Sequence, residues 1–67
     1  MITIMKRGIM GKAYEVHTYY DHERDKAERE AQATAARERL GSCYGIRDVW
    51  LRVSDQNGNT FDEPVIG

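Results

Sequence analysis

Two stretches of the chain alternate between hydrophobic and polar residues with the period of two that is typical of a half-buried β-strand. The first is Ala13–Tyr20, which is rich in aromatic and β-branched side chains. The second is Ile46–Val53, in which valine and leucine alternate with aspartate, tryptophan and arginine. A shorter β-prone run, Met1–Met5, precedes both of them. We expect residues 1–12 to form an edge strand or a loose N-terminal strand.

The segment between these two strands has the composition of a helix. Asp21–Leu40 is dominated by alanine, glutamate, arginine and lysine, which are good helix formers. Asp21 supplies a side-chain oxygen suited to an N-cap, and Gly41 follows the last helical residue. Ala27, Ala31 and Ala35 form a row at i, i+4 spacing. These small side chains predict close docking of the helix on a sheet.

A turn signal and a proline organise the C-terminal part. Asn57-Gly58 favours the positive φ angles of a type I′ hairpin turn, so Thr60 and Phe61 are expected to run back beside Val53. Pro64 lacks an N–H, and residues 64–67 are therefore predicted to form a C-terminal tail at a sheet edge or outside it.

The order of these elements predicts the fold class. It is α+β with two layers: an antiparallel β-sheet of three to four strands with one α-helix packed on one face, in the order β-β-α-β-β or β-α-β-β. Residues 1–67 are expected to form a single domain.

The alternation divides the sheet residues between two faces. The face toward the helix is expected to hold Tyr14, Val16, Thr18, Val49, Leu51, Val53 and Phe61. The opposite face is expected to hold Glu15, His17, Tyr19, Trp50 and Arg52. Tryptophan, tyrosine and arginine are enriched where proteins bind one another. These last five residues are therefore the predicted partner-binding site.

Composition narrows the classes of function. The chain has 67 residues, 31% of them charged, and a formal net charge of −1. Nonspecific nucleic-acid binders carry a cationic excess and acidic DNA mimics an anionic one, so balanced charge disfavours both. No apolar run approaches the roughly 18 residues of a membrane span. The single cysteine, Cys43, cannot form an internal disulfide and is expected to be a small packed side chain. That usage fits a cytoplasmic protein of the bacterial host cytosol.

No arrangement of residues indicates catalysis. The two histidines, His17 and His22, have no spacing that promises a second metal ligand or a catalytic acid. Gly8–Lys12 lacks the length and the Ser or Thr of a phosphate-binding loop, and Asp55–Asp62 lacks the closing glutamate of a calcium loop. We therefore predict no enzymatic activity, no metal and no cofactor.

As a whole the chain resembles the small anti-CRISPR proteins of phages and mobile elements, particularly those directed against type I systems. The likeness rests on its size, the Tyr14-Glu15-Val16 strand, the alanine-rich helix Ala27–Leu40 and the Val49–Phe61 hairpin that turns at Asn57-Gly58. The resemblance implies a non-enzymatic inhibitor that occupies a surface of a Cas surveillance-complex subunit and blocks DNA recognition or cleavage.

Two other readings of the exposed face stay open. One is a small nucleic-acid-binding or regulatory module, which would stack bases on the aromatic residues and contact phosphates through Lys6, Arg7, Lys12 and Arg47. The other is a homodimer in which a second copy covers the face.

Overall fold

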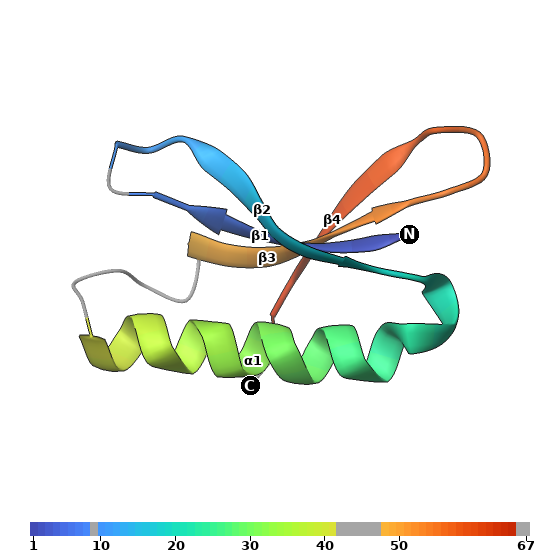
Figure 1. The fold of residues 1–67 in the computed structure, drawn as a ribbon. Helices are drawn as coiled ribbons and strands as arrows, with labels where there is room; N and C mark the ends of the chain where they lie inside the picture. Colours follow the sequence, from blue (N-terminus) through green and yellow to red (C-terminus); the bar gives the residue numbers. More distant parts are fainter. Residues whose placement is uncertain (9, 42–47, 66–67) are drawn as a thin grey trace.

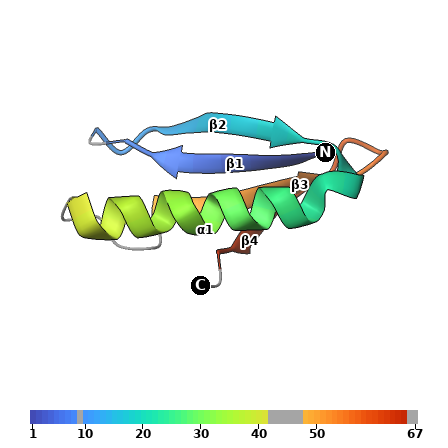
Figure 2. The ribbon, with the colours of Figure 1, turned by 60° about the horizontal axis from the view of Figure 1, so that its bottom comes forward.

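The computed structural model of the chain describes residues 1–8, 10–41 and 48–65. Its elements are β1 (Ile2–Arg7), β2 (Ala13–Tyr19), the 3-10 turn η1 (Asp21–Glu23), α1 (Arg24–Gly41), β3 (Val49–Ser54) and β4 (Thr60–Pro64). The four strands form one sheet in the order β2-β1-β3-β4, and each neighbouring pair is antiparallel. Figure 1 shows α1 lying along one face of this sheet, and Figure 2 shows the same helix from below. The predicted two-layer α+β fold is confirmed, in its β-β-α-β-β form.

Strand β1 occupies the centre of the sheet, so the expectation of an edge or loose strand is wrong. Ile2 pairs with Tyr19 on one side and with Val53 on the other. Ile4 is likewise flanked, and the exposed fractions of Ile2 and Ile4 are 1% and 0%. A strand that is covered by two neighbours and a helix buries its alternate residues completely, and in β1 those residues are isoleucines.

The core lies between β1, β3 and the alanine row of α1. Ala27, Ala31 and Ala35 are buried and form one hydrophobic cluster with residues of the two central strands and Val65: Ile2, Ile4, Val49, Leu51. Because alanine carries a single methyl group, the helix backbone can approach the sheet closely. The predicted docking through this row is confirmed.

The α-helix begins at Arg24, later than expected, because the 3-10 turn η1 precedes it, and Glu23 rather than Asp21 stabilises that turn. The backbone N–H of Tyr20 donates to the carboxylate of Glu23 at 3.1 Å, and this hydrogen bond lowers the pKa of Glu23. Asp21 does not cap the helix, since its carboxylate accepts a hydrogen bond from the Met1 amino nitrogen at 2.7 Å.

The β3–β4 hairpin pairs as predicted, although its turn is of another type. Val53 lies opposite Phe61 and Ser54 opposite Thr60. Among the described residues positive φ occurs at glycines, here Gly58 at 84°, so Asn57 does not have the conformation of a type I′ turn. The carboxylate of Asp55 instead accepts hydrogen bonds from two backbone N–H groups inside the turn, those of Asn57 at 2.8 Å and Asn59 at 2.9 Å.

The C-terminal tail was expected to begin at Pro64, but the sheet includes this residue. Pro64 is the last residue of β4 and lies opposite Trp50. Its missing N–H is tolerated because β4 is an edge strand. Val65 joins the core cluster. The predicted strand start at Ile46 and the packing of Cys43 lie outside the described residues.

Candidate functional site

The face of the sheet that α1 leaves uncovered carries the candidate site, and we call it the open face (Figure 1). Residues directly opposite each other in an antiparallel pair point to the same side. Because Ile4 and Leu51 face the helix, the intervening residues of each strand form the open face. Its members include Thr3, Met5 and Arg7 of β1, Glu15 and Thr18 of β2, Trp50 and Arg52 of β3, and Asp62 and Pro64 of β4.

The structure brings three of the five predicted site residues onto this face: Glu15, Trp50 and Arg52. It places the other two on the helix side. His17 lies opposite Ile4, and Tyr19 lies opposite Ile2 and packs against the core. The His17 and Tyr19 rings touch edge to face, with their centroids 4.5 Å apart.

A β-bulge in β2 separates these residues. Ile4 pairs with His17 while the next residue, Met5, pairs with Glu15, so Val16 is an additional residue in β2. One extra residue reverses the alternation of a strand between its two faces. Glu15 and His17, two positions apart, therefore point to opposite sides of the sheet.

The bulge also changes which residues meet the helix. Thr18, expected to face α1, lies on the open face, where its hydroxyl is 3.1 Å from that of Thr3. Tyr14, Val16 and Phe61 are 48%, 41% and 56% exposed, so none of them belongs to the core. The expected helix-facing set is correct for Val49, Leu51 and Val53. Tyr14, opposite Lys6, and Phe61, opposite Val53, also lie on the helix side of the sheet but are not buried there.

Tyr19 contributes to packing on the helix side. Burial raises the pKa of its hydroxyl, and the nearby carboxylates of Glu30 and Glu23 raise it further. The hydroxyl therefore stays protonated and neutral over the physiological range. This environment does not fit the predicted role of Tyr19 as a contact on the face that carries Trp50.

Trp50 lies near the centre of the open face beneath an arginine that the predicted site did not include. The guanidinium carbon of Arg7 is 5.1 Å from the centroid of the Trp50 ring, within the range of a cation–π contact. Met5 lies beside Trp50 and is 4% exposed. The Nε1 of Trp50 is buried and has no hydrogen-bond partner among the described residues. The alternation of Ile2-Thr3-Ile4, continued to residue 7, is the signal in the sequence that assigns Met5 and Arg7 to this face.

The open face is balanced in charge. Arg52 donates from Nε to the carboxylate of Asp62 at 3.1 Å. Arg7 and Glu15, both exposed, supply a second cation and a second anion. The face therefore combines apolar and aromatic surface with two groups of each sign.

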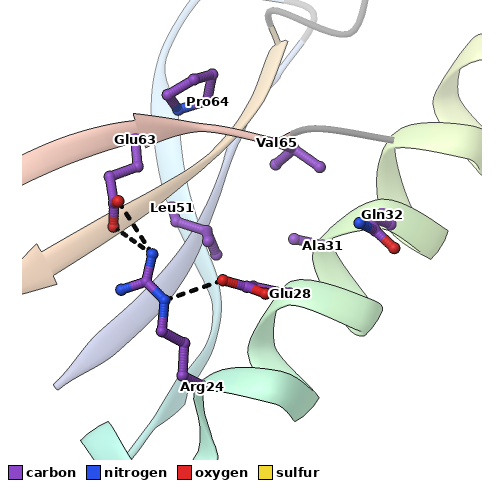
Figure 3. Close-up of a pocket in the computed structure, with 8 residues that line it drawn as sticks. All are labelled: Arg24, Glu28, Ala31, Gln32, Leu51, Glu63, Pro64 and Val65. Carbon is purple, nitrogen blue, oxygen red and sulfur yellow. Dashed lines mark hydrogen bonds and ion pairs between the residues drawn. The ribbon is translucent and has the colours of Figure 1, made fainter.

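A pocket of about 330 Å³ lies at the other side of the sheet, between α1 and the β3–β4 hairpin (Figure 3). Arg24 donates to both oxygens of Glu63, at 3.0 and 2.8 Å, and to Glu28 at 2.9 Å. These carboxylates raise the pKa of Arg24. Apolar side chains, Ala31, Leu51, Pro64 and Val65, complete the lining. Two carboxylates engage this guanidinium, so the pocket is poorly suited to an anion.

Neither a cluster of metal-binding side chains nor a membrane-spanning helix is found among the described residues. No three of their His, Cys, Asp or Glu side chains converge on a point where a metal ion could be held. His22 is exposed, and its ring stacks on that of Tyr20, with 5.8 Å between centroids. Within the described chain, no helix is both long enough and apolar enough to cross a membrane.

Comparisons of the chain with protein-family models, with curated proteins and with solved structures found no match.

Proposed function

We propose that this chain is a non-enzymatic binding protein that docks on another protein through the open face. The observation that carries the proposal is the position of Trp50, which stands with Met5 and Arg7 on the sheet face that α1 does not cover. Tryptophan, methionine and arginine are the residue types enriched at the centre of protein interfaces. A two-layer domain leaves such a face for a partner.

The charges of the open face favour a protein over a nucleic acid. Arg52 is neutralised by Asp62, and Arg7 is accompanied by Glu15 on the same face. The cation–π contact with Arg7 also occupies one side of the Trp50 ring, where a base would have to stack. A phosphate backbone gains affinity from unpaired cations, and this face offers few of them.

The size of the domain is sufficient for this role. A stable interface buries about 800 Å² per partner, roughly one sixth of the 4919 Å² accessible surface of the described chain. The protein would then act by steric occupation of its partner, without chemistry of its own.

The resemblance to type I anti-CRISPR proteins gives the finer form of the proposal. The partner is a subunit of a Cas surveillance complex in the bacterial cytosol, and occupation of its surface blocks DNA recognition or cleavage. The single cysteine supports a reducing compartment.

The test measures binding to purified type I surveillance complexes and inhibition of their DNA cleavage. Thr18→Arg places a bulky charge on the open face at an exposed position, and Ala36→Arg makes the same kind of change at an exposed position of α1. Trp50→Ala removes the central anchor and should weaken binding about 30-fold, the equivalent of about 2 kcal/mol. Circular dichroism establishes that each variant is folded.

We expect Thr18→Arg and Trp50→Ala to lose binding while Ala36→Arg retains it. Equal binding by all three folded variants would refute the open face as the docking surface. Salt-dependent binding of single-stranded DNA or RNA that Trp50→Ala abolishes would replace the proposal with a nucleic-acid function. A concentration-dependent dimer that Thr18→Arg disrupts would make a second copy the occupant.

A further inference from the structure

Arg7 and Trp50 both carry N–H donors without an acceptor among the described residues. The Nε1–H of Trp50 is buried and unpaired among the described residues. Arg7 is exposed, and its one hydrogen bond within the described chain runs from Nη1 to the carbonyl of Gly11 at 3.1 Å. A guanidinium has five N–H donors, so most of those of Arg7 face solvent.

Arg7 differs in this respect from Arg24, Arg37 and Arg52, whereas Arg29 likewise has one hydrogen bond within the described chain, to the carbonyl of Asp25 at 3.4 Å. Arg24 is held by Glu28 and Glu63, Arg37 lies 3.5 Å from Glu30, and Arg52 pairs with Asp62. Arg7 forms no ion pair with a described residue, although Glu15 lies on the same face. Its guanidinium is held over the Trp50 ring instead.

An unpaired buried donor has a free-energy cost, and folded proteins avoid it at nearly all positions. A ligand that supplies the missing acceptor recovers that cost when it binds. The acceptor must reach the edge of the indole while it neutralises the guanidinium above the ring. Among protein side chains, a carboxylate is the group that accepts from both kinds of donor and carries the complementary charge.

We propose that the Arg7–Trp50 pair binds an Asp or Glu side chain of the partner protein. The carboxylate accepts hydrogen bonds from the guanidinium of Arg7 and from Nε1 of Trp50. This inference rests on the proposed function, because it names the chemistry by which the same open face recognises its partner.

The test uses the indole N–H resonance of the chain, which belongs to Trp50 because the sequence has one tryptophan. The full-length ¹⁵N-labelled protein is titrated with a capped Val-Glu-Val peptide and with its Val-Gln-Val counterpart, which differs only in the charge of the central residue. We expect the glutamate peptide to move the indole proton resonance downfield, and the glutamine peptide to bind at least about tenfold more weakly.

Two variants separate the site from general attraction of charge. Arg7→Gln removes the exposed cation and should weaken binding of the glutamate peptide at least about tenfold. Arg29→Gln removes an exposed cation of α1 and should leave binding unchanged. Trp50→Phe keeps an aromatic ring without the N–H, and its loss of affinity is followed through the backbone amide resonances of Thr3 and Thr18.

Each outcome decides the proposal. An indole resonance that does not move, equal binding of the two peptides, or equal loss in Arg7→Gln and Arg29→Gln would overturn it. Tighter binding of a thymidine hexanucleotide than of the glutamate peptide, at the same indole, would assign the pair to nucleic acid. If the peptide does not bind while Thr18→Arg still abolishes capture of the surveillance complex, the carboxylate anchor is wrong and the proposed function stands. If the peptide binds and Thr18→Arg has no effect on capture, the proposed function fails alone.

Discussion

Truncation of Ile4 tests the central position of β1. Ile4 is fully buried, lies between His17 and Leu51 in the sheet, and belongs to the cluster that receives the alanines of α1. Replacing a buried isoleucine with valine typically costs about 0.5 to 1.5 kcal/mol, and replacing it with alanine costs about 2 to 5 kcal/mol, because a cavity remains. Domains are stabilised by roughly 0.05 to 0.15 kcal/mol per residue, which gives about 3 to 10 kcal/mol for 67 residues.

Ile4→Ala should therefore remove a large part of the total free energy of unfolding, and Ile4→Val a small part. Urea denaturation measures both, followed by far-ultraviolet circular dichroism and by the fluorescence of Trp50, which lies next to β1. Val16→Ala is the matched control, because Val16 belongs to the neighbouring strand and is 41% exposed. If Ile4→Ala costs no more than Val16→Ala, β1 does not form the centre of the sheet.

Three further changes probe other parts of the fold. Ala31→Leu inserts three carbons between helix and sheet and should cost about 1 to 3 kcal/mol in urea denaturation, whereas a stability equal to that of the wild type would show that the helix does not dock through this row. Gly58→Ala should cost roughly 1 kcal/mol of stability, because the backbone at this residue has a φ of 84°, which alanine adopts only with strain. Steric overlap does not contribute, since the added Cβ meets no atom within 4 Å. The control in thermal unfolding is Gly8→Ala, at a glycine without positive φ. The N–H of Asn59, and then that of Asn57, lower the pKa of Asp55, so the unfolded chain binds this proton more tightly than the folded protein does. The stabilisation by Asp55 is therefore complete above the ordinary aspartate pKa of about 3.9 and is lost as the pH falls through the lowered folded value. An Asp55→Asn variant should lose less stability than the wild type between pH 5 and about pH 2, and identical pH profiles would contradict this account.

The elements that local sequence determines were predicted correctly. The alanine row and the alternation of Val49 with Leu51 each bury one side of an element, and such patterns are set by residues close in the chain. The Asn57-Gly58 dipeptide likewise located the hairpin, since a turn needs a residue that tolerates positive φ. The turn type depended in addition on the Asp55 side chain, which competes for the N–H groups of the loop.

The elements that depend on distant pairing were not predicted. The position of Ile2–Arg7 in the sheet is decided by β3, more than 40 residues later in the chain, and the short run gave no local sign of two neighbours. The bulge at Val16 arises where β2 adjusts to β1, and a period-two reading of β2 alone assigned His17, Thr18 and Tyr19 to the wrong faces. The candidate site changed accordingly, with Met5 and Arg7 in place of His17 and Tyr19.

The pairing of β1 with β3 also has a consequence for how the chain folds. The β1–β2 and β3–β4 hairpins each close over a short loop, but β1 and β3 join Ile2 to Val53 and Lys6 to Val49. Formation of that seam fixes almost the entire chain at once, and its entropic cost must be met before the seam contributes stability. The seam also brings Met5 and Trp50 together. The open face therefore exists only where this seam has formed, and the β1–β2 and β3–β4 hairpins taken separately do not present it to a partner.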